Sequence, residues 1–205
     1  MQIRYATGLS AEEYVRQQAW KQARLENCPI HPEGGCGFGK NGTYGREYPE
    51  GTKVARWYCA LGHTTFGLLP DCLSSRLSGS LNEVESVVVQ VEQSPSQEEA
   101  AKNIRMNIDL PSVLRWIRRR VKPVQNSLAM LIEIAPFLFS DCNPTISSFR
   151  CLLCVEPVLV DLRSRASPYL HLLPPPLGFG PRIQRKKIKK MHFQHETGTD
   201  PPVKK

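Results

Sequence analysis

The 205-residue sequence contains no apolar run that approaches the roughly 18 residues a membrane-spanning helix needs. Its first residues include the polar Gln2 and Arg4 instead of the apolar segment of a secretory signal. We therefore expect a cytoplasmic protein that binds no membrane, with its seven cysteines kept reduced. Closely spaced reduced cysteines favour metal binding over disulfides.

The sequence also lacks the residue groupings of common catalytic sites. It has no phosphate-binding glycine loop and no grouping of Ser, His and Asp. Acidic residues are few in the second half, and Asp141, Glu156 and Asp161 stand in no setting that favours a metal-binding acidic cluster. We expect a protein without catalytic activity.

Soft metal ligands, in contrast, are dense between Cys28 and His63. Zinc prefers four tetrahedral Cys or His ligands, and two close pairs of them can hold one ion. The best four candidates are Cys28, Cys36, Cys59 and His63, and the alternatives are His31 and Cys72. Because all four ligands would be protein groups, the zinc would be structural.

The first pair has a stretched Cys-x7-Cys spacing, whereas ligand spacings of about two to five residues are common. Cys28 could instead pair with His31 and leave Cys36 as a bystander. Between the ligand pairs, residues 42–45 and 53–58 are β-prone, and Pro49 to Gly51 is turn-forming. This pattern predicts a β-hairpin, with Trp57 packed over the metal site.

The helical predictions start with residues 9–26, where Ser10 and Glu13 are spaced as a capping box. Periodic apolar residues predict further helices at 80–93, 95–104 and 110–121, with a turn at 107–109. Three short helices, the last of them basic, are typical of a helix-turn-helix that binds DNA. The candidate DNA-binding residues are Ser112, Arg115, Arg118, Arg119, Arg120 and Lys122.

An apolar helix at 126–139 is expected to join the core. Cys151 and Cys154 form a Cys-x2-Cys without a partner pair and are better explained as buried free thiols. The Pro-rich segment at 174–181 is typical of a stiff linker.

The 24 residues from Arg182 onward hold eight Lys or Arg and two Asp or Glu, and so carry +6 of the net charge of +8. Such a tail should be disordered when free and should add salt-sensitive affinity for nucleic acid. Its basic block consists of Arg185, Lys186, Lys187, Lys189 and Lys190.

The run from Arg56 through Cys59 and His63 to Phe66 resembles the second knuckle of the zinc ribbon at the N-terminus of bacterial insertion-sequence transposases. The run from Cys36 to Thr43 resembles the first knuckle, and the resemblance covers roughly residues 12–125. The chain departs from that pattern in having His63 where a Cys is usual. It is also similar to uncharacterised bacterial proteins found with mobile elements. The resemblance implies DNA binding and a possible transposase partner.

Together these features predict a small α+β protein, in which a zinc-ribbon hairpin precedes a helix-turn-helix bundle and a disordered basic tail. The expected segments are an N-terminal helix at 9–27, a zinc ribbon at 28–72, a helical domain at 80–140, an extension at 141–173, and the linker and tail at 174–205. The expected function is nucleoid-associated DNA binding. The alternatives are a protein-interaction adaptor and a vestigial fragment without activity.

Overall fold

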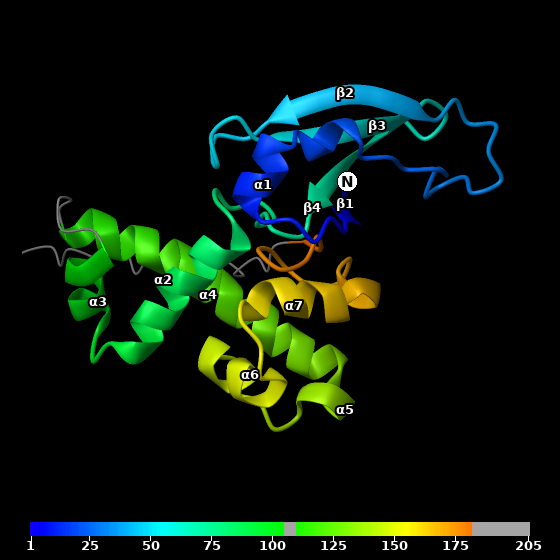
Figure 1. The fold of residues 1–205 in the computed structure, drawn as a ribbon. Helices are drawn as coiled ribbons and strands as arrows, with labels where there is room; N and C mark the ends of the chain where they lie inside the picture. The colour runs from blue at the N-terminus through cyan, green and yellow to red at the C-terminus, as the bar shows by residue number, and fades with distance from the viewer. Residues whose placement is uncertain (105–109, 182–205) are drawn as a thin grey trace, which may run out of the picture.

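The computed structural model describes residues 1–104 and 110–181 (Figure 1). Within these ranges the chain forms a four-stranded sheet, seven α-helices and two 3-10 turns, as the predicted α+β class requires. The strands are β1 (Gln2–Tyr5), β2 (Gly39–Gly45), β3 (Lys53–Cys59) and β4 (Thr64–Pro70). The helices are α1 (Ala11–Arg16), α2 (Leu81–Gln93), α3 (Gln97–Ile104), α4 (Leu110–Ile134), α5 (Pro136–Phe139), α6 (Ile146–Leu153) and α7 (Val158–Arg165). Among the described helices, not one combines the length and apolar composition needed to cross a membrane.

The sheet has the strand order β1-β4-β3-β2. The predicted hairpin is present, because β2 pairs antiparallel with β3, and β4 continues the antiparallel pairing on the other side of β3. β1 pairs parallel with β4, with Gln2 opposite Gly67. The first residues of the chain therefore complete a sheet that the sequence pattern had indicated only as a hairpin.

The N-terminal helix is shorter than predicted. Ser10 and Glu13 form the expected capping box, but α1 ends at Arg16 and a separate 3-10 turn spans Ala19–Lys21. Gln18 has a left-handed φ of 51°, which interrupts the helix. The break turns Trp20 into the apolar core beside the sheet, where it is 7% exposed.

The helical layer differs from the prediction in one long helix. The helix predicted at 110–121 and most of the helix predicted at 126–139 are joined in α4, which continues through Pro123 to Ile134. The last residues of the second prediction form the separate helix α5. A proline inside a helix removes one backbone hydrogen bond and costs about 3 kcal/mol. Here the buried apolar stripe is unbroken from Val121 through Val124 to Leu128, so packing holds the helix together. The predicted turn at 107–109 lies outside the described residues.

Two glutamates of α2 hold the starts of two later helices. Glu85 accepts hydrogen bonds from the backbone N–H groups of Val158 and Leu159, at 3.0 and 2.8 Å. Glu92 accepts from the backbone N–H groups of Ile146 and Ser147. Carboxylates stabilise the N-termini of helices, where backbone N–H groups lack partners. The predicted extension at 141–173 is therefore a pair of helices, α6 and α7, docked on α2.

The predicted Pro-rich linker is instead part of the core, because residues 173–178 and Gly180 are buried. Proline carries no backbone N–H, so only its carbonyl oxygen needs a partner when the residue is buried. Ser127 donates to Pro174 O at 2.8 Å, and the backbone N–H of Ser75 donates to Pro176 O at 2.9 Å. Phe179 packs against both the helical core and the core beside the sheet.

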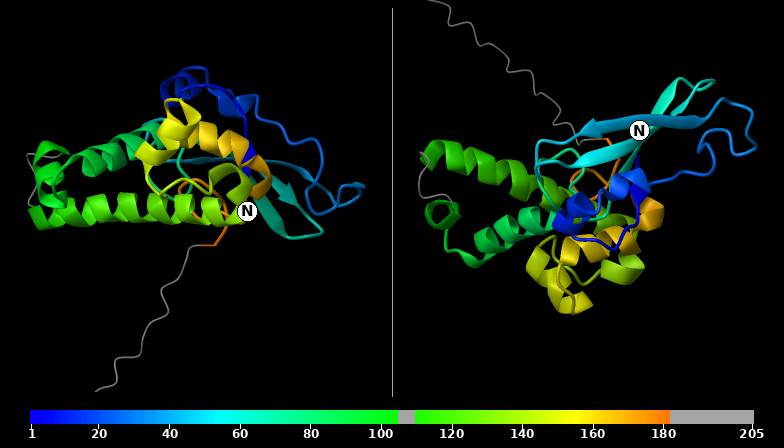
Figure 2. Two further views of the ribbon diagram at one scale, coloured as in Figure 1. Left: turned by 90° about the horizontal axis from the view of Figure 1, so that it is seen from below. Right: turned by 45° about the horizontal axis from the view of Figure 1, so that its top comes forward.

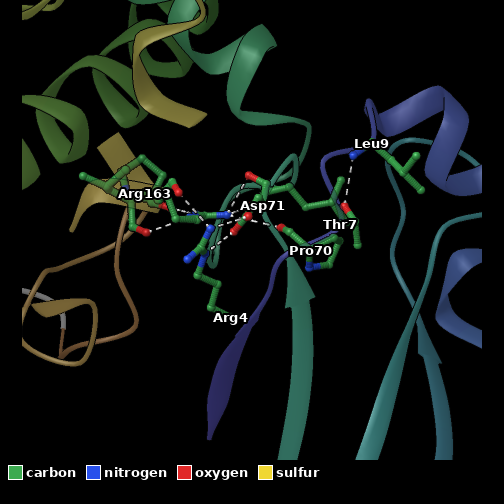
Figure 3. Close-up of polar contacts among 10 residues, drawn as sticks. Arg4, Thr7, Leu9, Pro70, Asp71 and Arg163 are labelled. Atoms are coloured by element: carbon green, nitrogen blue, oxygen red, sulfur yellow. Dashed lines mark hydrogen bonds and ion pairs between the residues drawn. The ribbon is translucent and has the colours of Figure 1, made fainter. Parts of the chain in front are cut away.

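The fully buried Arg163 of α7 binds this segment to the end of β4. Its guanidinium donates to the carbonyl oxygens of five residues, which lie in two separate stretches of chain. These acceptors are Pro70, Asp71, Leu73, Pro176 and Leu177. Figure 3 shows this cluster next to the bidentate ion pair of Arg4 with Asp71, at 2.8 and 2.9 Å.

Replacing Arg163 by Ala should lower the free energy of unfolding by about 3–5 kcal/mol, because it leaves buried carbonyl groups without donors. Arg165→Ala is the matched control on the same helix. Its partly exposed ion pair with Asp161 should contribute about 0–1 kcal/mol. Urea unfolding followed by circular dichroism measures both variants. Equal effects of the two substitutions would contradict the central role of Arg163.

Candidate metal centre

Four metal-binding side chains meet at one end of the hairpin. One ligand atom from each of Cys28, His31, Cys36 and Cys59 lies within 4.8 Å of all the others. The three cysteines are buried, at 3%, 3% and 0% exposure, and His31 is half-buried. Thiol and imidazole groups gathered in this way form a Cys3His set, which is a common composition of structural zinc sites.

Local chain geometry brings the ligands together. Cys59 is the last residue of β3, and Cys36 lies three residues before β2. A hydrogen bond of 3.1 Å from the backbone N–H of Leu61 to Cys36 O links the two ligand loops. Gly62 passes so close that a Cβ there would lie 3.3 Å from Cys59 Sγ, and its N–H donates to that sulfur.

Two of the sulfur–nitrogen separations fit a tetrahedral zinc ion. Bond lengths of about 2.3 Å for Zn–S and 2.0–2.1 Å for Zn–N place sulfur and nitrogen about 3.6 Å apart. His31 Nδ1 lies 3.3 Å from Cys59 Sγ and 3.8 Å from Cys28 Sγ, on either side of that value. The residues present therefore have both the chemistry and the spacing for one zinc ion.

The thiols have different proton affinities. Burial raises the pKa of Cys28, but hydrogen bonds from His31 and Ile30 outweigh burial and lower the pKa to about 6. Burial and the neighbouring Cys28 and Cys59 thiols raise the pKa of Cys36 to about 11. Three thiolates at this separation would repel one another, so a bound cation is needed to hold all three deprotonated.

Aromatic rings enclose the cluster on the sheet side. Phe38 stacks on Trp57 with ring centroids 5.3 Å apart and meets Phe66 edge-on at 6.0 Å. Phe66, with the three cysteines, forms a small buried apolar cluster, and Trp57 packs against it as predicted. This shell keeps water from the sulfur atoms and fixes the ends of β3 and β4.

The cluster contains His31 in place of the predicted His63. His63 Nδ1 lies 3.2 Å from the hydroxyl of Tyr58, the residue that precedes Cys59 in β3. Successive side chains of a strand point to opposite faces, so this contact places His63 away from the Cys59 sulfur. The Cys-x2-His spacing of Cys28 and His31 was the sequence feature that pointed to His31 as a ligand. That interpretation, however, left Cys36 as a bystander, whereas the cluster contains both residues.

Cys72, the other alternative ligand, also lies outside the cluster. It is buried in the apolar core beside the sheet with Tyr14 and Leu73. Burial raises the pKa of its thiol to about 11, as expected for a cysteine that packs as an apolar residue. Cys151 and Cys154 were predicted to be buried, but both are exposed.

The predicted DNA-binding residues lie on the N-terminal half of α4. Ser112, Arg115, Arg118, Arg119 and Lys122 are exposed, and Arg120 is half-buried. Arg118 donates to Gln97 of α3 at 3.2 Å, and the guanidinium of Arg120 lies 3.7 Å from the centre of the Trp116 ring. The predicted basic block at 185–190 lies outside the described residues.

No protein-family model matches the chain, and neither a curated protein nor a solved structure matches it. The likeness to transposase zinc ribbons therefore rests on the motif residues themselves, and the site must be interpreted from its own geometry.

Replacing His31 by Ala should weaken zinc binding more than about 100-fold, because losing a ligand costs more than losing an outer-shell partner. His63→Ala is the matched control and should leave the affinity unchanged. Elemental analysis and competition with a chromogenic chelator measure stoichiometry and affinity. We expect about one zinc per wild-type chain. Loss of metal in His63→Ala alone would instead assign His63 as the ligand.

Zinc binding at pH 7.5 should release at least one proton, because Cys36 has a raised pKa and must lose its proton to bind. Cys28, with its lowered pKa, is already a thiolate at that pH. Affinity should therefore increase with pH near neutrality, by about tenfold per unit for each proton released. Calorimetric titration in buffers of different ionisation enthalpy counts the protons. An enthalpy independent of the buffer would contradict this assignment.

Proposed function

We propose that this chain is a nucleic-acid-binding protein in which a zinc ribbon with a structural ion supports a basic helical surface. The ion would be held by Cys28, His31, Cys36 and Cys59, and these four protein ligands leave no position for a substrate. The zinc would stabilise the fold, and binding would take place on α4.

The basic face of α4 carries this proposal. Arg115, Arg119 and Lys122 are spaced four and three residues apart, so they share one exposed side of the helix. The opposite side is the buried stripe that includes Val113 and Ile117. Arginine recognises phosphate oxygens and guanine edges, and an α-helix fits the major groove of DNA.

The position of this face also supports the proposal. α2, α3 and the first half of α4 project from the rest of the molecule, and α3 lies at the far end (Figures 1 and 2). All three helices pack against one another. A projecting three-helix unit with exposed arginines on its last helix can approach a duplex, with the β2–β3 loop lying beside Arg119. The helix-turn-helix interpretation stays part of this proposal, with α3 and α4 as its helix pair.

A binding role fits the acidic residues of the second half better than a catalytic role. Glu156 forms an ion pair with Arg150 at 2.9 Å, and Asp161 forms one with Arg165 at 2.5 Å. These carboxylates are held by arginines on or beside their own helices and do not converge on a common point.

We propose that the protein acts in the cytoplasm, associated with the nucleoid.

The second candidate is a protein-interaction adaptor. Most of the segment at 126–139 is occupied by core packing, since Leu128, Leu131 and Phe139 are buried. Phe137 and Leu138 remain 74% and 51% exposed, and an adaptor would use these two side chains for a protein partner such as a transposase.

Charge reversal of α4 tests the proposal. Arg115→Glu with Arg119→Glu should weaken duplex DNA binding by about 1–3 kcal/mol per arginine and reduce the salt dependence by about one unit each. Fluorescence anisotropy with a labelled duplex at several salt concentrations measures both quantities.

Arg16→Glu, on the exposed surface of α1, is the control with the same charge change per site. It should leave duplex affinity within about threefold of wild type, because it lies outside the α4 face. Equal losses per reversed charge in the control and the double variant would reduce the effect to net charge. Full DNA binding by the double variant would remove α4 from the interface and favour the adaptor.

A further inference from the structure

The sheet has two faces, and the metal centre occupies only one of them. Successive side chains of a strand point to opposite faces. In β3, Trp57 and Cys59 point to the face of the metal centre, where Phe66 also packs. Arg56 and Tyr58 therefore point to the other face. The end of the hairpin that bears them projects away from helices α2 to α7 (Figure 1).

This second face, called the open face, is formed by Tyr44 of β2, Arg56 and Tyr58 of β3, and Thr65 of β4, all of them half-buried. Tyr58 lies opposite Thr65 in the strand register, and Arg56 lies opposite Gly67. A Cβ on Gly67 would lie 3.3 Å from Cε1 of Tyr44, so the glycine lets the Tyr44 ring cross the face towards β4. The open face is therefore a shallow surface of aromatic rings beside one arginine.

Arg56 gives the open face a positive charge that the described chain does not neutralise. Its Nε is buried and makes no hydrogen bond within residues 1–104 and 110–181. The four strands and the turn at 60–63 contain no Asp or Glu, whereas they contain four Lys or Arg residues. A buried donor without an acceptor is costly, so the open face favours an anionic ligand.

Tyr58 supplies a ring whose direction is fixed. Its hydroxyl lies 3.2 Å from Nδ1 of the exposed His63, which holds the ring at the end of the strand. Aromatic rings on a sheet stack on unpaired bases whatever their sequence. An arginine beside such a ring binds the phosphate that joins two nucleotides.

Other anionic partners fit these groups less well. The carboxylates of an acidic protein segment would meet the negative face of the Tyr58 ring. The bases of an intact duplex are stacked on one another, so they offer no ring face to Tyr58. An unpaired strand offers both a base to the ring and a phosphate to Arg56.

We propose that the open face binds single-stranded DNA, with one base stacked on Tyr58 and the adjoining phosphate at Arg56. This site is separate from the basic face of α4, which lies at the opposite end of the molecule (Figure 1). The choice of DNA over RNA rests on the proposed function of α4. The protein would thereby hold a duplex on α4 and an unpaired strand on the sheet.

The test measures the affinity of the full chain, purified with zinc, for a labelled 12-nucleotide single strand and for the matching duplex. Tyr58→Leu should lower single-strand affinity about 5- to 100-fold, the range that stacking on one aromatic ring supplies. Tyr58→Phe keeps the ring and should retain binding. Duplex affinity should stay within about threefold of wild type in both variants. Circular dichroism and zinc content check that each variant is folded.

The arginine is tested against a control on the same strand. Arg56→Gln should weaken single-strand binding and reduce its salt dependence by about 0.7 units, the value for one phosphate of a single strand. Lys53→Gln removes the same charge from the other face of β3, where Lys53 is exposed. It should leave both quantities close to wild type.

The outcomes separate this site from the face of α4. Single-strand binding that depends on Tyr58 and Arg56, with duplex binding retained, supports the open face. Single-strand binding that is unchanged in both variants, or lost equally in Lys53→Gln, overturns the open face and leaves the duplex proposal standing. A wild-type chain that binds duplex but no single strand does the same. A tenfold preference for RNA of the same sequence would overturn the choice of DNA.

Discussion

The buried guanidinium of Arg163 is the interaction on which the rest of the structure depends. Moving a cation out of water costs several kcal/mol unless hydrogen bonds replace its hydration. Arg163 receives that replacement from five backbone carbonyl groups, which belong to the end of β4 and to the Pro-rich segment. Each stretch includes a proline acceptor, Pro70 or Pro176, whose residue carries no backbone N–H group. One side chain from α7 therefore joins the sheet, the helices and the end of the described chain.

Around this junction the molecule has two parts with different means of stabilisation. The sheet part has an apolar core that includes Val54, Leu68 and Leu69. The far end of its hairpin has a small cluster of three cysteines and Phe66, and the order of that end would come from a metal ion. The helical part has a large apolar core, and α2 organises it by holding the starts of α6 and α7 through Glu85 and Glu92. α4 contributes both to the helical core and to the proposed interface, because its C-terminal half is buried in this core while its N-terminal half presents arginines.

The candidate functions follow from this division. A closed Cys3His set would hold an ion without offering it to a substrate, so the proposed role of a metal at this site is structural. The exposed Arg115 and Arg119 of α4 are the groups on which the nucleic-acid role proposed above depends. The hairpin then has a mechanical role. Next to its β2–β3 loop, Arg46 donates to the backbone carbonyl of Leu77 ahead of α2, so the hairpin whose far end gathers the four candidate ligands also contacts the helical part.

The sequence by itself determined the features that depend on neighbouring residues. The capping box of Ser10, the hairpin and the apolar stripe of α4 follow from local patterns, as does a group of Cys and His residues that could hold a metal ion. Only the tertiary structure decided between His31 and His63, because that choice depends on which face of β3 each side chain reaches. Only it continued α4 through Pro123, added β1 to the sheet and buried the Pro-rich segment. Each of those outcomes is set by packing against residues distant in the chain, and a local pattern carries no information about such partners.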